Sequence, residues 1–171
     1  SRNEAIEIGI AELLINRLRV LPGVLVTPLS SVRRDSGVDR DPLQAGRELD
    51  VAAVVEGTVQ VLQDQVRLTA RLLDVASGRS IWAGDFTENF GDFFVLQDAL
   101  VTQLVAALAV EVPAEVRARL VAHTTTDTKA WQLYANGRYQ LERREPEAFT
   151  RARQYFEAAI ERDPRFSLAM T

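Results

Sequence analysis

The chain has 171 residues, 47% of them hydrophobic and 26% charged, so it is long and apolar enough to bury a sizeable core in one or two globular domains. Its formal net charge of -4 provides no basic footprint for nucleic acid and no polybasic membrane anchor. The absence of cysteine excludes disulfides, thiolate metal sites and cysteine nucleophiles. We therefore expect no direct contact between this segment and nucleic acid.

The most apolar run of the chain, residues 99–110, still includes Thr102 and Gln103. Because a helix needs roughly 20 predominantly apolar residues to cross a bilayer, the run indicates a buried helix and predicts no membrane insertion. No signal-peptide pattern opens the chain, which starts immediately before one helical pattern and stops inside another. We therefore expect it to be a fragment of a longer protein.

The first part of the chain predicts a helix and then a strand. Apolar residues recur every three or four positions from Ile6 to Leu21, which is typical of a helix with one buried face. Pro22-Gly23 ends this pattern. The apolar run 24–26 predicts a short strand.

The polar stretch 30–40 predicts an exposed loop. Asp35, Asp39 and Asp41 within and beside it are oxygen ligands of the kind that calcium prefers, but arginines interleave with them and the EF-hand spacing is missing. A solvated, self-neutralised loop is the other interpretation. Asp41 and the following proline also have the chemistry of an N-cap and first turn for a short helix over 43–49.

From residue 52 to residue 86 the hydrophobic period changes from 3.6 to 2, which predicts strands. A two-residue turn at Gln63-Asp64 sets the register of a hairpin, and Ser77-Gly78 leads into a third strand, 79–86, with Trp82 and Phe86 on one side. These signals predict a three-stranded antiparallel meander with one buried and one wet face. The buried face pairs Val61 with Val66, Val59 with Leu68 and Val55 with Leu72; the wet face pairs Gln60 with Arg67, Thr58 with Thr69 and Glu56 with Arg71.

Residues 89–92 predict the cap of a long helix that runs to residue 110, and 113–122 predicts a further helix, before a polar break that ends in the N-cap residue Asp127. We place a domain boundary there, between an α+β domain, 1–126, and a helical part, 127–171. The expected fold class is α+β: a mixed sheet with a three-stranded antiparallel meander packed by helices, followed by an α-helical hairpin. The leucines of the long helix form one stripe: Leu96, Leu100, Leu104 and Leu108.

The last part of the chain predicts two helices, over 131–139 and 152–160, with a turn at 143–146. Small residues beside an aromatic one in the second helix let the two helices approach closely. In the first helix, Ala135 and Gly137 compete for the corresponding small position. This hairpin resembles a tetratricopeptide repeat, and because one repeat cannot bury its apolar face, more repeats are expected after it.

The sequence contains no constellation that we would assign to catalysis. His123 is the only histidine, so no Ser/His/Asp triad and no second imidazole at a metal can be assembled without it. A surface role, or one at the C-terminus of a helix, is expected for it. Phosphate-binding, dinucleotide-binding and nucleophile-elbow motifs are missing. We therefore expect no enzyme, no catalytic residue, no cofactor and no metal.

Two charged groups have alternative interpretations. Asp85, Glu88 and Asp92 could act as paired acid/base carboxylates, or they could complement the dipole at the start of the long helix. Arg143-Arg144 could contact phosphate, or could lie in a solvated turn. In both cases the structural interpretation is favoured.

Aromatic and basic side chains on the first hairpin helix are the candidate partner-binding residues. They are Trp131, Tyr134, Arg138 and Tyr139, which could form a peptide-binding groove. Core packing of the hairpin is the competing interpretation for the aromatic members.

Several collinear segments resemble the TolB-like amino-terminal domain that is fused to tetratricopeptide repeats in bacterial signalling proteins. The family normally begins with an apolar strand before the first helix, which this chain lacks, so a sheet position would stay unfilled. The segments that carry the resemblance are 9–18 (GIAELLINRL), 26–32 (VTPLSSV), 41–49 (DPLQAGREL), 55–57 (VEG), 67–74 (RLTARLLD), 81–83 (IWA) and 94–98 (FVLQD).

The resemblance implies a non-enzymatic sensory or protein-interaction module of a bacterial signalling protein or membrane-anchored winged-helix transcriptional regulator. Such a module would relay binding of a protein or peptide partner to an output domain outside this chain, on the periplasmic or alternatively the cytoplasmic side. The alternative is a small-molecule sensor with a pocket between the sheet and the helices; a hydrolase is a third possibility. An open sheet edge and uncovered Tyr155, Phe156 and Phe166 also predict self-association.

Overall fold

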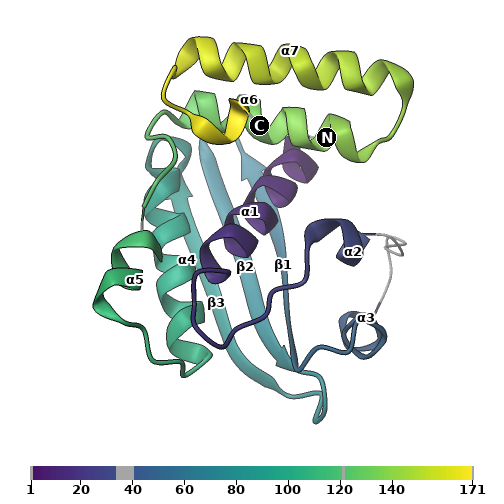
Figure 1. Ribbon diagram of the computed structural model, residues 1–171, viewed down its shortest axis with the longest axis vertical. Coiled ribbons are helices and arrows are strands. Elements are labelled where there is room, and N and C mark those ends of the chain that lie inside the picture. The colour runs from purple at the N-terminus through teal and green to yellow at the C-terminus, as the bar shows by residue number, and fades with distance from the viewer. Residues whose placement is uncertain (1, 34–40, 121, 171) are drawn as a thin grey trace.

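The structure is a computed structural model that describes residues 2–33, 41–120 and 122–170 (Figure 1). Its helices and strands follow one another in chain order: α1 (Arg2–Leu18), α2 (Leu29–Arg33), α3 (Pro42–Glu48), β1 (Ala53–Leu62), β2 (Gln65–Asp74), β3 (Ser80–Asn89), the 3-10 turn η1 (Phe90–Asp92), α4 (Phe93–Ala107), α5 (Ala114–Leu120), α6 (Thr128–Glu142), α7 (Pro146–Arg162) and the 3-10 turn η2 (Ser167–Met170).

The predicted meander is confirmed, and its first hairpin has the predicted register in all six pairs. The strands lie in the order β1-β2-β3, and both pairings are antiparallel. The turn works because Gln63 takes a positive φ of 53°, as a tight two-residue hairpin requires. The third strand is longer than expected, since β3 runs on to Asn89 before η1 begins.

Helices α1 and α4 cover one face of the sheet and make the molecule α+β, as expected (Figure 1). The stripe Leu96, Leu100 and Leu104 of α4 is at most 1% exposed and packs against the inner face of the strands. Glu7 of α1 accepts a hydrogen bond from the Val59 amide at 3.3 Å, which satisfies one donor of the edge strand β1.

The expected strand at 24–26 is wrong. Among the described residues the sheet holds only the three antiparallel strands, and 24–26 is irregular backbone. Val24 and Val26 instead pack beside the small cluster of Leu18, Leu21, Val101 and Leu120. The short apolar run therefore holds the loop after α1 against this cluster by hydrophobic contact.

Carboxylates were expected at the starts of two helices, α3 and α4. Asp41 caps α3 by accepting a hydrogen bond from the Leu43 amide at 3.1 Å. Asp92 stands at the N-cap position of α4 as expected but makes no side-chain capping hydrogen bond, whereas Asp85 and Glu88 lie in β3 rather than at the start of the helix. The other residues of the proposed calcium loop, Asp35 and Asp39, lie outside the described part of the chain.

The helical hairpin is confirmed, with α6 and α7 side by side across one end of the sheet (Figure 1). Gly137 is the small residue that lets them approach, because a Cβ there would lie 2.5 Å from the Phe156 ring. Ala135 instead faces Gly9 of α1. Phe166 is fully buried against Tyr134, so one of the aromatic residues expected to be open is covered by the chain itself.

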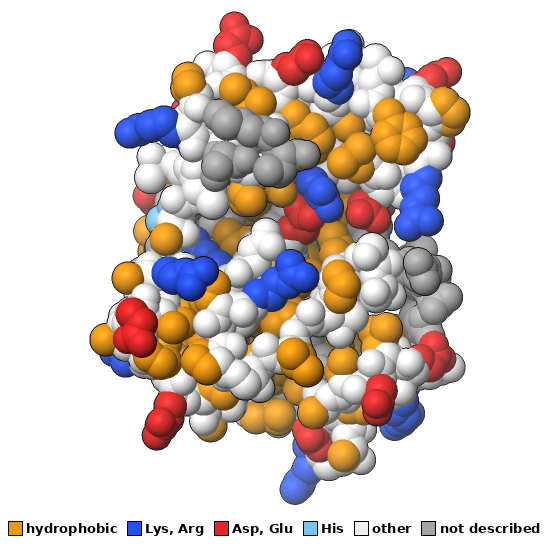
Figure 2. All heavy atoms as spheres, viewed as in Figure 1, with side chains coloured by type: hydrophobic (Ala, Val, Ile, Leu, Met, Phe, Trp, Pro, Cys, Tyr) orange, Lys and Arg blue, Asp and Glu red, His pale blue; other side chains and the backbone are white. Residues whose placement is uncertain are grey.

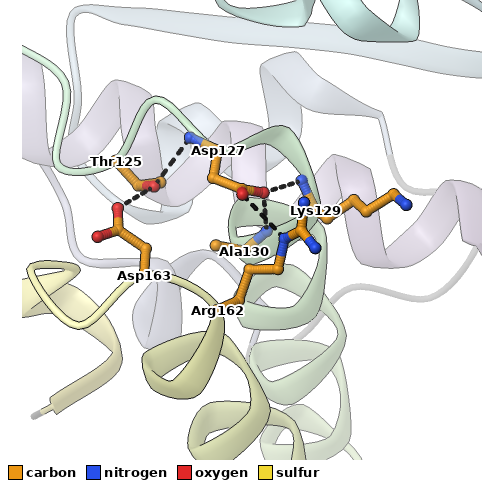
Figure 3. Close-up of polar contacts among 6 residues, drawn as sticks. All are labelled: Thr125, Asp127, Lys129, Ala130, Arg162 and Asp163. Atoms are coloured by element: carbon orange, nitrogen blue, oxygen red, sulfur yellow. Dashed lines mark hydrogen bonds and ion pairs between the residues drawn. The ribbon is translucent and has the colours of Figure 1, made fainter.

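A polar cluster fixes the junction before α6 to the end of α7 (Figure 3). Asp127 accepts hydrogen bonds from the amides of Lys129 and Ala130, at 2.9 and 3.0 Å, and from Arg162 Nε at 2.8 Å. Thr125 donates to Asp163 at 2.6 Å. One buried core includes residues on both sides of this junction, and the proposed domain boundary stays a prediction.

Within the described residues, Phe90–Ala107 is long and apolar enough to cross a membrane by length and composition alone. Here its apolar stripe belongs to the same buried core as residues of the sheet and of α1.

Candidate functional site

A cavity of about 290 Å³ lies between α1, the start of α4, the segment before α6, and α6 itself. Its apolar walls come mainly from Leu13, Phe94, Trp131 and Tyr134, and its polar lining includes Arg17 and Gln97. The expected pocket between sheet and helices is not where this cavity lies, because large side chains fill that interface.

Arg17, Asp98 and His123 form a hydrogen-bonded network at one side of the cavity. Arg17 Nη1 donates to Asp98 Oδ1 at 2.8 Å, and Arg17 Nη2 lies 3.0 Å from His123 Nδ1. Since a guanidinium only donates, Nδ1 is the acceptor, and Nε2 carries the proton toward Asp98 Oδ2 at 3.0 Å. The network thus gives hydrogen-bond partners to the Arg17 guanidinium, whose side chain is only 7% exposed.

The expected surface or helix-terminal role of His123 missed this network. Its ring also meets Phe94 edge-on, with the centroids 5.0 Å apart. The three polar partners are separated by 25 to 106 positions in the sequence, so no local spacing signals them.

A second network, of Glu12, Tyr134 and Arg138, joins α1 to α6. The Tyr134 hydroxyl donates to Glu12 Oε2 at 2.9 Å, and Arg138 pairs with Glu12 Oε1. Burial raises the pKa of the Glu12 carboxyl above its ordinary value of 4.5, against the opposing effects of Arg138 and the Tyr134 hydroxyl. Burial, and then the Glu12 charge, raises the pKa of Tyr134, so this hydroxyl stays a donor.

Gln97 is the unusual side chain of the cavity. It is fully buried on α4, and neither Nε2 nor Oε1 has a hydrogen-bond partner among the described residues. A buried polar group without a partner costs about 1–3 kcal/mol, and most proteins avoid it. The amide is therefore a candidate for an external hydrogen-bonding partner.

The structure brings three of the four predicted partner-binding residues to α1. Trp131 is 4% exposed and its ring lies tilted against Phe93, with the centroids 4.5 Å apart, while Tyr134 and Arg138 contact Glu12. Tyr139 is half-buried and takes no part in the lining of the cavity. Partner binding by these residues stays a prediction. In the structure Trp131, Tyr134 and Arg138 make contacts within the chain itself.

The other predicted charged groups do not converge on the cavity. Asp85 pairs with Arg67 across strands at 2.8 Å on the exposed face of the sheet, and Arg143 pairs with Glu145 at 3.1 Å in the turn between α6 and α7. No group of three or more acidic or histidine side chains that could hold a metal occurs among the described residues. On the face drawn in Figure 2, acidic and basic side chains are interspersed among apolar ones.

No family model matches the chain. It is similar to a protein of Rhizobium meliloti (strain 1021) named "Putative adenylate cyclase 3", with 27% identity over 161 residues. The match covers 94% of this chain and 27% of the relative, so the chain spans about a quarter of that protein's length.

This match contradicts the expectation of a non-enzymatic module in a signalling or transcriptional regulator, together with its sensor alternative, and the expectation that no enzyme is involved. The expectation rested on the TolB-like resemblance and on the lack of a catalytic constellation in these 171 residues. A chain that aligns with a quarter of a longer protein can lack such a constellation while that protein is an enzyme. What the chain is similar to is a segment of a protein named as a cyclase.

Proposed function

We propose that this chain is part of an adenylate-cyclase-type enzyme, which converts ATP to cyclic AMP and pyrophosphate. The similarity to the Rhizobium meliloti protein carries this proposal, because it extends over 94% of the chain and so takes in both the sheet and the hairpin. Since the aligned part is 27% of the relative, the activity is assigned to the longer polypeptide rather than to the cavity alone.

Within that enzyme, the segment holds the helical hairpin in a fixed orientation on the α+β part. Two features support this role. Gly9 lets α1 approach the Trp131 ring closely, and the Glu12, Tyr134 and Arg138 network ties the same two helices together. Both contacts join parts of the sequence more than a hundred positions apart, so they set tertiary orientation rather than local structure.

Cyclic AMP formation by the full-length protein tests the enzymatic assignment. Purified protein is incubated with ATP and Mg²⁺ or Mn²⁺, and cyclic AMP is quantified by mass spectrometry. We expect it to accumulate with at least one cation. A folded full-length protein that forms none with either cation contradicts the proposal.

The orienting role is tested with Tyr134→Phe, which removes only the hydroxyl that donates to Glu12. We expect slower cyclic AMP formation with an unchanged KM for ATP. Tyr155→Phe on α7 is the matched control, because the Tyr155 hydroxyl has no such bond among the described residues and its loss should leave the rate unaltered. Equal rates for both variants and the wild type would refute the orienting role.

A further inference from the structure

We propose that the cavity beside Gln97 binds a small, neutral, planar molecule that presents a hydrogen-bond donor and acceptor side by side, such as a lactam or an amidine-edged heterocycle. This inference goes beyond the proposed function and does not rest on it.

The first support is the unfilled hydrogen-bonding capacity of Gln97. Gln97 belongs to the lining of the cavity, its side chain is fully buried, and both Nε2 and Oε1 are unpartnered among the described residues. A carboxamide offers a donor and an acceptor in one plane, and this pair matches a heterocycle edge that offers an acceptor and a donor. Hydrogen bonds of this kind are strengthened in a buried site of low dielectric.

The charge state of the lining indicates a neutral occupant. The buried Arg17 is already paired with Asp98 and His123, and Glu12 is already paired with Arg138 and Tyr134. Neither of these two charged groups is left to balance an ion, and Arg119, the remaining charged residue of the lining, is exposed to solvent. The Gln97 amide, by contrast, is a buried polar group of the lining whose donor and acceptor have no partner among the described residues.

The walls indicate a flat occupant. Phe94, Trp131 and Tyr134 supply aromatic surface, and the volume of about 290 Å³ suits a single or fused ring rather than a large ligand. Gln97 itself is closed to water, so an entering ring must displace a neighbouring side chain. Leu13 is half-buried and lines the same cavity, which makes it the natural candidate for that movement.

The test measures the thermal unfolding midpoint of the full chain and its Trp fluorescence in the presence of four probes. Two probes carry the required edge, 2-pyridone and 2-aminopyridine, the latter used at a mildly alkaline pH at which it is uncharged. N-methyl-2-pyridone lacks the donor, and indole is planar but lacks an acceptor. We expect the first two to raise the midpoint and saturate, and the other two to bind about tenfold more weakly or worse.

Gln97→Leu keeps the approximate volume and removes the amide. We expect this variant to lose the response to both edge-bearing probes while its own midpoint rises, because an unpartnered polar group has been removed from the core. Gln103→Leu is the matched control, since Gln103 is exposed on the same helix and its replacement should leave probe binding intact. Leu13→Phe narrows the cavity with Gln97 in place and should also abolish binding, which keeps the test decisive if Gln97→Leu folds poorly.

Any of these results would overturn the proposal: no response to either edge-bearing probe, equal binding of N-methyl-2-pyridone, unchanged binding in a folded Gln97→Leu protein, or unchanged binding in Leu13→Phe. The outcome is independent of cyclic AMP formation. A protein that binds the probes but makes no cyclic AMP would support the binding site and contradict the proposed enzymatic function. A protein that makes cyclic AMP but binds no probe would support the enzymatic function and contradict the binding site.

Discussion

Gly9 of α1 lies so close to Trp131 of α6 that a Cβ on Gly9 would stand 2.8 Å from the indole ring. The ring also packs against Phe93, with the centroids 4.5 Å apart, so a shift of the indole would disturb that contact. Overpacking of this kind costs about 1–3 kcal/mol, while Gly→Ala inside a helix gains at most about 1 kcal/mol of propensity. We therefore expect Gly9→Ala to lower the free energy of unfolding by about 1 kcal/mol, measured by urea denaturation.

Gly91→Ala provides the comparison, because nothing lies within 4 Å of a Cβ at that position. Its stability should equal or exceed that of the wild type. Adding Trp131→Phe to Gly9→Ala should recover part of the loss attributable to the clash. A Gly9→Ala protein as stable as Gly91→Ala would show that the helices separate without cost.

Asp98→Ala should destabilise the fold by about 2 kcal/mol, because it leaves the buried Arg17 guanidinium without its carboxylate. The value is smaller than for a fully buried pair, since the Asp98 side chain is 37% exposed. Asp85→Ala removes the carboxylate of an ion pair that is exposed on both sides, and its unfolding midpoint should stay near that of the wild type. Similar midpoints for the two variants would contradict the importance of the Arg17 network.

Acid should weaken the junction drawn in Figure 3. Hydrogen bonds from Ala130 and Arg162 hold the pKa of Asp127 below its ordinary value of 3.8, and Thr125 lowers that of Asp163 in the same way. A lowered folded pKa contributes stability above the unfolded pKa that is lost as pH falls through the folded one.

Asp127→Asn keeps an N-cap but does not titrate, so the slope of stability against pH below about 4 should flatten. The measurement is the urea midpoint between pH 5 and pH 2. Asp92→Asn, at a carboxylate without a capping hydrogen bond, is the control and should leave the slope as it is. An acid slope that is identical in Asp127→Asn and the wild type would argue against the assignment.

The contribution of Glu12 to stability changes with pH in the opposite direction to that of Asp127. Burial raises its folded pKa, so its contribution is fully present below the ordinary value of 4.5 and is lost as pH rises through the folded pKa. Glu12→Gln should therefore become more stable relative to the wild type as pH rises from 4 to 7. The measurement is the free energy of unfolding of both proteins in urea at each pH. Glu115→Gln, on exposed surface of α5, should track the wild type throughout.

Local patterns carried most of the fold. The register of β1 and β2 follows from alternation and a two-residue turn, because a slip of one position would turn Val59 and Leu68 out of the core. The cap at Asp127 is equally local, since its acceptor and donors lie within three positions. The resemblance to a TolB-like domain stays a prediction.

The candidate site could not be predicted in this way. Arg17, Asp98 and His123 meet only after α1, α4 and the segment before α6 have packed together, and Gln97 reads in the sequence as one more polar residue beside an apolar stripe. The strand expected at 24–26 also depended on long-range packing: its apolar residues predicted burial, but Val24 and Val26 pack against Leu18 and Leu21 instead of pairing with the sheet.

The contact between α1 and α6 also bears on how the protein is made. Glu12 leaves the ribosome 122 residues ahead of Tyr134, its partner. At synthesis rates of about 5–20 residues per second, α1 waits roughly 6 to 24 seconds before the helix that covers its other side exists. During translation the meander can close locally, but the apolar flank of α1 around Gly9 stays uncovered, so the nascent chain passes through a stage in which a chaperone has a surface to hold.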